Sequence, residues 1–381
     1  MLADAALLTL DIQTKAWAAG WTLKDAAASN VLFDNGRAVF CDLLSFRRRQ
    51  DSDEAGWVAY GQFIRNFVLP LLAVGQLGRT PRDVFLASRD GLRASEIAPF
   101  LPWHSHMGLS MWLHVSLPAW FERRRITRPA SAAKSSAAAA GQGRRNEAAN
   151  WLLRDLGKFV QRLRAQRSAT TSWSHYTENR EHYGDSELGS KRTAVKSVLD
   201  GGQFSRVLDI GANSGEFSLL AVAAGCSVAA LDDDLSALDQ LHQHAALAKL
   251  PVQCLHANFA RPTPPTGWRC GETLSLSQRL QGQFDLVLML AVIHHLVVSE
   301  RLPLEQVFEV VSGYCSHSLL IEFVPLGDPR FIEIAGPNIA LYEHWTLDRF
   351  ISAAAPWFKL VRAMPIAGGS ERQLLLLEKT S

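Results

Sequence analysis

The stretch RVLDIGANSGEFS, from Arg206 to Ser218, decides the fold of the second half of this 381-residue chain. The apolar run Arg206–Ile210 predicts a buried β-strand, and the residues after Gly215 predict a helix. Between the two lies a short loop that holds Gly211 and Gly215. A strand, a glycine loop and a helix in this order are typical of the ligand-binding edge of a parallel sheet.

Strands and helices alternate from this segment to the end of the chain. Such alternation predicts an α/β domain with a mainly parallel sheet and helices on both of its faces. We therefore expect a Rossmann-like sheet of seven strands. The expected strands lie at residues 206–210, 227–231, 252–256, 284–290, 318–323, 358–361 and 373–378.

The first half of the chain predicts a smaller α+β domain, residues 1–127. Apolar residues at helical spacing predict a helix from Leu2 to Ala18. Two short β-like runs, 30–33 and 38–41, are joined by Asp34-Asn35-Gly36, and Asn-Gly between such runs predicts a hairpin. Residues 56–74 predict a long apolar helix.

The segment between the two halves changes composition. Residues 128–150 are small, polar and of low complexity, which predicts a linker. Residues 151–204 predict a helical lid or connector, and we expect its first helix to pack on the second domain. The second domain itself is expected at residues 205–381.

Charge and cysteine content limit the partners. With 39 basic and 37 acidic residues the net charge is +2, so a nucleic-acid partner is not favoured. We found no apolar run long enough for a membrane span, and expect no membrane partner. Five scattered cysteines without a CxxC pair argue against disulfides and a zinc site, suit a reducing cytoplasm, and suggest no metal. They are Cys41, Cys226, Cys254, Cys270 and Cys315.

The glycine loop and the second strand together predict a site for an adenosine ligand. Gly211 allows the backbone to approach a ligand closely, and the helix after Gly215 turns free N–H groups toward a carboxylate. Asp232 follows the second strand, where dinucleotide folds hold ribose hydroxyls. NAD and flavin proteins share this arrangement, but they typically carry GxGxxG, and the loop here is GANSG. Asp209 suits an ammonium group better than a pyrophosphate, which favours S-adenosylmethionine (SAM) over NAD.

Several segments, in order, resemble the motifs of class I SAM-dependent methyltransferases. They are VLDIGANSGEFS, then ALDDD at 230–234, HANFARP at 256–262 and FDLVLMLAVIHHL at 284–296. The resemblance covers Trp173 to Ser381 and implies SAM as cofactor. Its methionine part would lie against the first glycine loop, its ribose at Asp232 and its adenine near Asn258. The implied cofactor-binding residues are Asp209, Gly211, Ala212, Asn213, Gly215, Asp232, Asp233, Asn258 and Phe259.

The residues before the first strand are candidates for a lid. In this fold an N-terminal segment often crosses the bound cofactor, so Tyr176 and Tyr183 are expected to stack on it or to bond to it. Packing in the core is the alternative for both.

The candidate catalytic residues are His294, His295 and Glu322. Because the two histidines are adjacent, they point in different directions on any regular element. A neutral imidazole suits a general base, although purely structural roles are equally open. Positioning alone also supports methyl transfer. Glu322 ends the fifth strand, where it binds the acceptor, pairs with a histidine, or is simply solvated. Tyr342, His344 and Trp345 are weaker acceptor candidates.

The N-terminal half holds a kinase-like pattern that lacks its partners. Asp25, Asn30 and Asp42 are spaced as in the catalytic loop of small-molecule phosphotransferases. Only 24 residues precede Asp25, so neither a glycine-rich phosphate loop nor an ATP-binding lysine strand fits there. We therefore expect a degenerate lobe used for structure, substrate binding or dimerisation, which leaves a homodimer open. This half, followed by the methyltransferase motifs, resembles the bacterial NoeA-like, nodulation-related methyltransferases.

These observations predict a bacterial biosynthetic enzyme that transfers a methyl group to an O or N atom of a small molecule, such as a secondary metabolite or glycan. The alternatives are a methyltransferase that acts on RNA or protein, and a non-catalytic module that binds SAM or a partner. Aromatic and histidine side chains of residues 103–120 either line an acceptor pocket or, as we favour for most, pack in the core. They are Trp103, His104, His106, Trp112 and Trp120.

Overall fold

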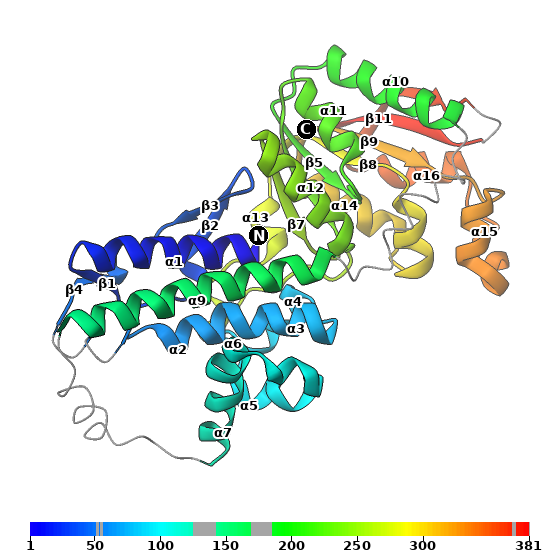
Figure 1. Cartoon of the computed structure of the whole chain (residues 1–381). Coiled ribbons are helices and arrows are strands. Elements are labelled where there is room, and N and C mark those ends of the chain that lie inside the picture. The colour runs from blue at the N-terminus through cyan, green and yellow to red at the C-terminus, as the bar shows by residue number, and fades with distance from the viewer. Residues whose placement is uncertain (51–52, 54–55, 125–141, 169–184, 368–370, 381) are drawn as a thin grey trace. The chain divides into compact units, whose positions relative to one another are not determined.

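The computed structural model describes residues 1–50, 53, 56–124, 142–168, 185–367 and 371–380. The chain divides into two compact units, Met1–Thr171 and Ser172–Ser381, shown from blue to red in Figure 1.

The second unit is built on one seven-stranded sheet, in the order β10-β11-β9-β8-β5-β6-β7. Five strands run parallel, whereas β11 is antiparallel to both β9 and β10. This confirms the predicted Rossmann-like sheet. The strands are β5 (Arg206–Ile210), β6 (Ser227–Asp232), β7 (Val252–His256), β8 (Phe284–Met289), β9 (Cys315–Phe323), β10 (Phe358–Pro365) and β11 (Gln373–Lys379).

Both faces of this sheet are buried. Successive residues of a strand point to opposite faces, and the core follows that alternation. Val287 and Met289 belong to one hydrophobic cluster, and Leu286 and Leu288 belong to the other. Burial on both faces explains why these strands are near-continuous apolar runs in the sequence.

Seven helices are described in the second unit. The first cluster packs on α13 to α16, and the second packs on α10 and α11. The short α13 and α15 were not predicted. Each begins at a side-chain cap, since Ser275 forms a capping box with Gln278 and Asp328 accepts from the N–H groups of Arg330 and Phe331. The helices are α10 (Asp185–Gly201), α11 (Glu216–Ala223), α12 (Leu235–Ala248), α13 (Leu276–Leu280), α14 (Leu304–Tyr314), α15 (Pro329–Ala335) and α16 (Leu347–Ala354).

The first unit has the predicted α+β character. The hairpin is confirmed, with β2 (Val31–Asp34) paired to β3 (Arg37–Phe40) around Asn35-Gly36, and β1 (Trp21–Leu23) pairs with β4 (Phe46–Arg48). Its described helical segments include α1 (Leu2–Ala18), α2 (Tyr60–Phe63), a π-helical turn (Ile64–Val68), α3 (Leu69–Leu77), α4 (Pro81–Ala87), α5 (Ala94–Ile97), α6 (Leu109–Met111), α7 (Leu117–Arg123) and α9 (Gln142–Ser168).

The predicted connector is wrong in its first part. Helix α9 lies in the first unit, where Leu156, Phe159 and Val160 are buried in the same cluster as residues of α1 and α3. An amphipathic pattern shows that one face of a helix is buried, but it does not identify the partner. Residues 142–150 of the predicted linker form the start of α9, and 125–141 lie outside the described residues.

The kinase-like residues close local turns. Asn30 Nδ2 donates to Ser45 Oγ at 3.2 Å, and Ser45 Oγ donates to Asp42 Oδ2 at 2.5 Å. Asp25 Oδ1 accepts from the N–H of Ala27 at 2.9 Å. Side chains of this kind commonly stabilise turns by such bonds, so these contacts fit the structural role expected for a degenerate lobe.

A buried polar chain ties α9 to the other helices of the first unit. The Tyr60 hydroxyl lies 2.6 Å from His114 Nδ1, and His114 Nε2 lies 3.0 Å from Asp155 Oδ2. Ser110 Oγ donates to the other oxygen of Asp155 at 3.2 Å, and Arg162 donates to Ser110 Oγ at 2.7 Å. Burial lowers the pKa of His114 below its usual 6.5, against the pull of Asp155.

This lowered pKa predicts that acid destabilises the first unit. Below pH 6.5 the unfolded chain binds a proton on His114 that the folded chain resists, so the free energy of unfolding should fall as the pH drops further. Amide hydrogen exchange in α9 should therefore speed up between pH 7 and pH 5.5, after correction for the intrinsic pH dependence of exchange. His114→Gln should flatten that trend, and the exposed His104→Gln should leave it intact. Equal trends in all three proteins would contradict the prediction.

Candidate cofactor and acceptor site

The site lies at the carboxyl ends of the parallel strands. From β5 the chain moves outward through β6 and β7, and then returns to β8 on the other side of β5. The strand order therefore reverses between β5 and β8. In open α/β sheets this is where ligands bind, because the loops after the two strands diverge there.

Two glycines shape the loop after β5. Gly211 and Gly215 have φ angles of +77° and +85°, which L side chains rarely adopt. A Cβ on Gly211 would lie 2.2 Å from Val292 Cγ2, and one on Gly215 would lie 2.3 Å from Leu241 Cδ1. From the sequence, Gly211 was expected to let the backbone approach a ligand closely. The structure adds a constraint within the chain, since Val292 belongs to the loop after β8.

Asp232 ties two loops together. Its Oδ2 accepts from the N–H of Asn213 at 2.7 Å, and its Oδ1 accepts from the N–H of Asp234 at 2.8 Å. Ala212, which is buried, donates its N–H to the carbonyl of Leu231 at 3.2 Å. These bonds hold the loop after β5 against the loop after β6.

A second set of bonds joins the loop after β7 to the same edge. Asn258 Nδ2 donates to Asp233 Oδ2 at 2.9 Å, and Asn258 Oδ1 accepts from the N–H of Arg261 at 3.0 Å. Phe259 packs against the hydrophobic core, edge-on to Tyr314. The structure thus brings Asn213, Asp232, Asp233 and Asn258 together at this edge, and the Phe259 ring is partly buried nearby.

Asp209 lies beneath this edge. Its side chain is only 2% exposed and accepts a hydrogen bond from Ser218 Oγ at 2.7 Å. Burial raises the pKa of Asp209 to about 6, with a smaller contribution from the charge of Asp232. A nearby cation would lower that pKa again, because it favours the charged carboxylate.

The two histidines after β8 differ in burial, although their ring centres lie only 4.3 Å apart. His294 is 1% exposed, its ring stacks on Phe331 at 6.5 Å, and neither ring nitrogen has a hydrogen-bond partner among the described residues. Burial lowers the pKa of His294 to about 3, so its imidazole is neutral at pH 7 but is a weak base. His295 is partly exposed and begins a π-helical turn (His295–Ser299), and burial lowers its pKa too.

Glu322 is fully buried, which contradicts its description as a solvated strand end. Lys191 Nζ lies 2.5 Å from one of its oxygens, and Arg372 donates to the other at 3.2 Å. Arg372 also makes two hydrogen bonds with Asp328, at 2.6 and 2.9 Å. Lys191 and Arg372 were not predicted from the sequence, because neither belongs to a motif and they are 181 positions apart.

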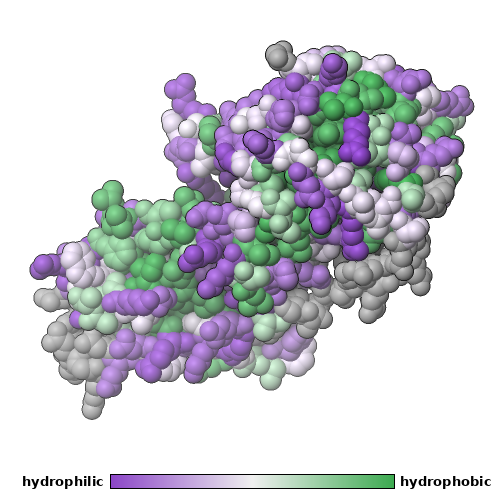
Figure 2. Space-filling model, turned by 90° about the horizontal axis from the view of Figure 1, so that it is seen from above, coloured by the Kyte–Doolittle hydropathy of each residue, from purple (hydrophilic) through white to green (hydrophobic). Residues whose placement is uncertain are grey.

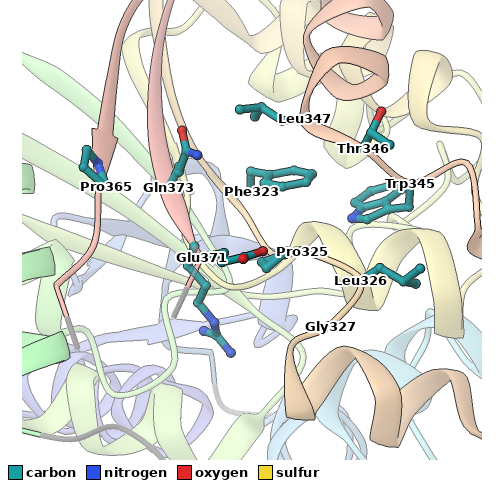
Figure 3. Close-up of a pocket in the computed structure, with 11 residues that line it drawn as sticks. Phe323, Pro325, Leu326, Gly327, Trp345, Thr346, Leu347, Pro365, Glu371 and Gln373 are labelled. Carbon is teal, nitrogen blue, oxygen red and sulfur yellow. The ribbon is translucent and has the colours of Figure 1, made fainter. Parts of the chain in front are cut away.

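Arg372 also lines a cavity of about 480 Å³ beyond the end of β9. Figure 3 shows Gln373 and Pro365 on its β10–β11 side and Trp345 and Leu326 on the other. The indole N–H of Trp345 donates to the carbonyl of Val324 at 2.8 Å, which fixes the ring in the cavity wall. Of the other weak candidates, Tyr342 packs on the core and His344 is exposed.

The lid candidates Tyr176 and Tyr183 lie outside the described residues, as does Trp173.

One curated protein and several solved structures are similar to this chain. No family model matches the chain. The nodulation protein NoeA of Rhizobium meliloti (strain 1021) is 26% identical over 385 aligned residues, which cover 100% of this chain and 78% of NoeA.

Two solved structures illustrate the structural matches. The N-methyltransferase NodS from Bradyrhizobium japonicum WM9, in complex with S-adenosyl-L-homocysteine, is 13% identical, with a TM-score of 0.38, and the match covers 54% of this chain and 98% of NodS. Magnesium protoporphyrin IX methyltransferase from Synechocystis PCC 6803 is 17% identical, with a TM-score of 0.38, and the match covers 54% of this chain and 94% of that enzyme.

The sheet order and the motifs at its carboxyl edge fit one fold, and the similarity to NoeA extends over the whole of this chain. The chain has the Rossmann-like fold of the class I SAM-dependent methyltransferases, whose cofactor is SAM, and it resembles the NoeA-like nodulation proteins along its whole length.

Proposed function

We propose that the chain transfers a methyl group from SAM to an O or N atom of a small-molecule acceptor, such as a secondary metabolite or a glycan. The observation that carries this proposal is the set of three loops, after β5, β6 and β7, that Asp232 and Asn258 hold together at the sheet edge. When bound there, SAM would supply an electrophilic methyl group on a sulfonium.

The residues of these loops suit the separate parts of SAM. Each oxygen of Asp232 accepts one backbone N–H and keeps acceptor capacity for a ribose hydroxyl. Asp233 and Asn258 are proposed to border the adenosine. The Gly211–Gly215 loop is proposed to border the methionine part, with the Asp209 carboxylate close beneath it. Tyr176 and Tyr183 remain proposed lid residues.

On the acceptor side, the chain's main contribution is orientation. A displacement at a methyl group gains much of its rate from alignment of the two reactants. His294 offers an unprotonated imidazole in a dry site, which suits accepting a hydrogen bond from the acceptor more than removing its proton. His295, which is less buried, is the better candidate base. Glu322 is proposed to keep Lys191 and Arg372 in place beside the cavity.

A glycine substitution tests the cofactor site. Gly211→Ala brings a Cβ against Val292 at a positive φ, so SAM affinity should fall on the order of tenfold or more, as for other strained backbone sites. Gly225→Ala is the matched control, because its φ is +90° but nothing lies within 4 Å of the new Cβ. Titration calorimetry should show loss in the first variant only. Absence of SAM binding by the unmodified chain would refute the proposed function.

Substitution of the two histidines distinguishes an enzyme from a module that only binds SAM. In a mixture of protein, SAM and a host metabolite extract, one small metabolite should gain the mass of a methylene group. His294→Ala and His295→Ala should each slow that reaction by about 10²-fold or more while SAM affinity stays within a few-fold. Full activity in both variants would exclude a role for the pair. Methylation of RNA or protein alone would exclude a small-molecule acceptor.

Glu322 is expected to contribute mainly to the free energy of unfolding. Glu322→Gln removes the charge between two buried cations, which typically costs about 3–5 kcal/mol of unfolding free energy. Glu305→Gln is the control, because the Glu305–Arg349 pair is exposed and such pairs contribute about 0–1 kcal/mol. Urea unfolding measures both. A Glu322→Gln variant of normal stability that no longer turns over would instead show a direct catalytic role.

A further inference from the structure

Five apolar side chains of the first unit lie on its surface within a span of thirteen residues. Trp103 is 77% exposed, Met107 76%, Phe100 72%, Leu109 66% and Trp112 52%. We call this group the aromatic patch. The expectation that the tryptophans of this segment pack in the core is wrong for Trp103, Trp112 and Trp120. Exposed apolar side chains that gather on one segment are candidates for a binding surface.

The aromatic patch is held outward by an anchored segment. The segment consists of short helical turns between α5 and α7, which lie together in Figure 1 (cyan). Met111 and Val115 are buried in the core of the unit. Ser105 Oγ donates to Gln76 Oε1 at 2.9 Å, and His106 Nδ1 lies 2.8 Å from Ser116 Oγ. The inner side chains are thus fixed, so the outer ones remain in water.

Arginines outnumber carboxylates at the two ends of the segment that carries the aromatic patch. From Ile97 to Phe121 the sequence has no Asp, Glu, Lys or Arg. Two exposed carboxylates lie at its ends and each accepts one backbone N–H, Glu96 from Arg93 at 2.9 Å and Glu122 from Ser95 at 2.8 Å. The sequence then continues with arginines at 123, 124, 125 and 128. Arg124 lies with its guanidinium 4.3 Å from the ring centre of Trp120.

We propose that the aromatic patch docks this protein on the surface of a membrane that contains anionic lipids. Trp, Phe, Met and Leu side chains without charges suit the boundary between headgroups and acyl chains, where Trp is enriched. The adjacent arginines suit the lipid phosphates above that boundary. This is docking on one leaflet, and no described helix is long and apolar enough to cross a membrane. No membrane partner was expected from the sequence, because only spanning segments were considered there.

Vesicle flotation of the full chain tests this proposal. We expect binding to vesicles of phosphatidylcholine mixed with phosphatidylglycerol, and much weaker binding to phosphatidylcholine alone. Trp103→Ser with Met107→Ser should weaken binding on the order of tenfold or more, because two exposed apolar anchors are lost. Arg123→Gln with Arg124→Gln should weaken it too and reduce its sensitivity to salt.

The matched control lies elsewhere on the first unit, whose surface shows other apolar groups in Figure 2. Leu43 and Leu44 are 79% and 82% exposed, so Leu43→Ser with Leu44→Ser should leave vesicle binding unchanged. Circular dichroism melting checks that all variants fold. The proposal is overturned by lack of binding to anionic vesicles, or by equal binding of the Trp103/Met107 variant. It is also overturned if the Trp103/Met107 variant loses a dimer seen by sedimentation but still binds vesicles. The aromatic patch would then bind a second copy of this chain.

Discussion

The carboxylate of Asp232 is the contact on which the candidate site depends. It accepts backbone N–H groups from Asn213 and Asp234, and so joins the loop after β5 to the loop after β6. The parallel register of Ile210 with Leu231 ends both strands at the same level, which makes this bridge possible. Burial raises the pKa of Asp232, and the two N–H donors oppose that shift. A carboxylate balanced in this way can both organise loops and receive polar groups of a ligand.

Packing against neighbouring segments explains why the loop after β5 needs glycine at two positions. Gly211 faces Val292 from the loop after β8, and Gly215 faces Leu241 from α12. Each glycine therefore meets a different neighbouring segment, and any Cβ would push that segment away. The donor side of the site and the histidine loop are consequently in contact through Gly211 and Val292.

The elements that the sequence predicted correctly are those determined by a short stretch of neighbouring residues. The strands β5 and β7 were placed at their observed bounds, because a strand buried on both faces is a compact apolar run between turn residues. The β2–β3 hairpin followed from Asn35-Gly36. The partner of α9, the capped helices α13 and α15, and the ion pairs of Lys191 and Arg372 were missed. Each of these depends on which distant residues meet, and hydrophobic periodicity carries no such information. The exposed tryptophans were misjudged for the same reason, since composition favours burial and only the fold shows which side faces water.

The two halves of the proposed reaction site are thus encoded differently. The donor half consists of backbone N–H groups, glycines and carboxylates within single loops. Each of its motifs can therefore be recognised in a short continuous stretch of sequence. The buried ion-pair cluster proposed for the acceptor half instead draws on α10, β9, the cap of α15 and the residue before β11, through Glu322, Lys191, Arg372 and Asp328. Burial makes these four charges interdependent, because removal of any one leaves an uncompensated partner in a dry site. If the cavity holds the acceptor, a substitution that changes specificity must preserve this balance, which makes the partly exposed wall residue Leu326 a more permissive position than the buried Trp345.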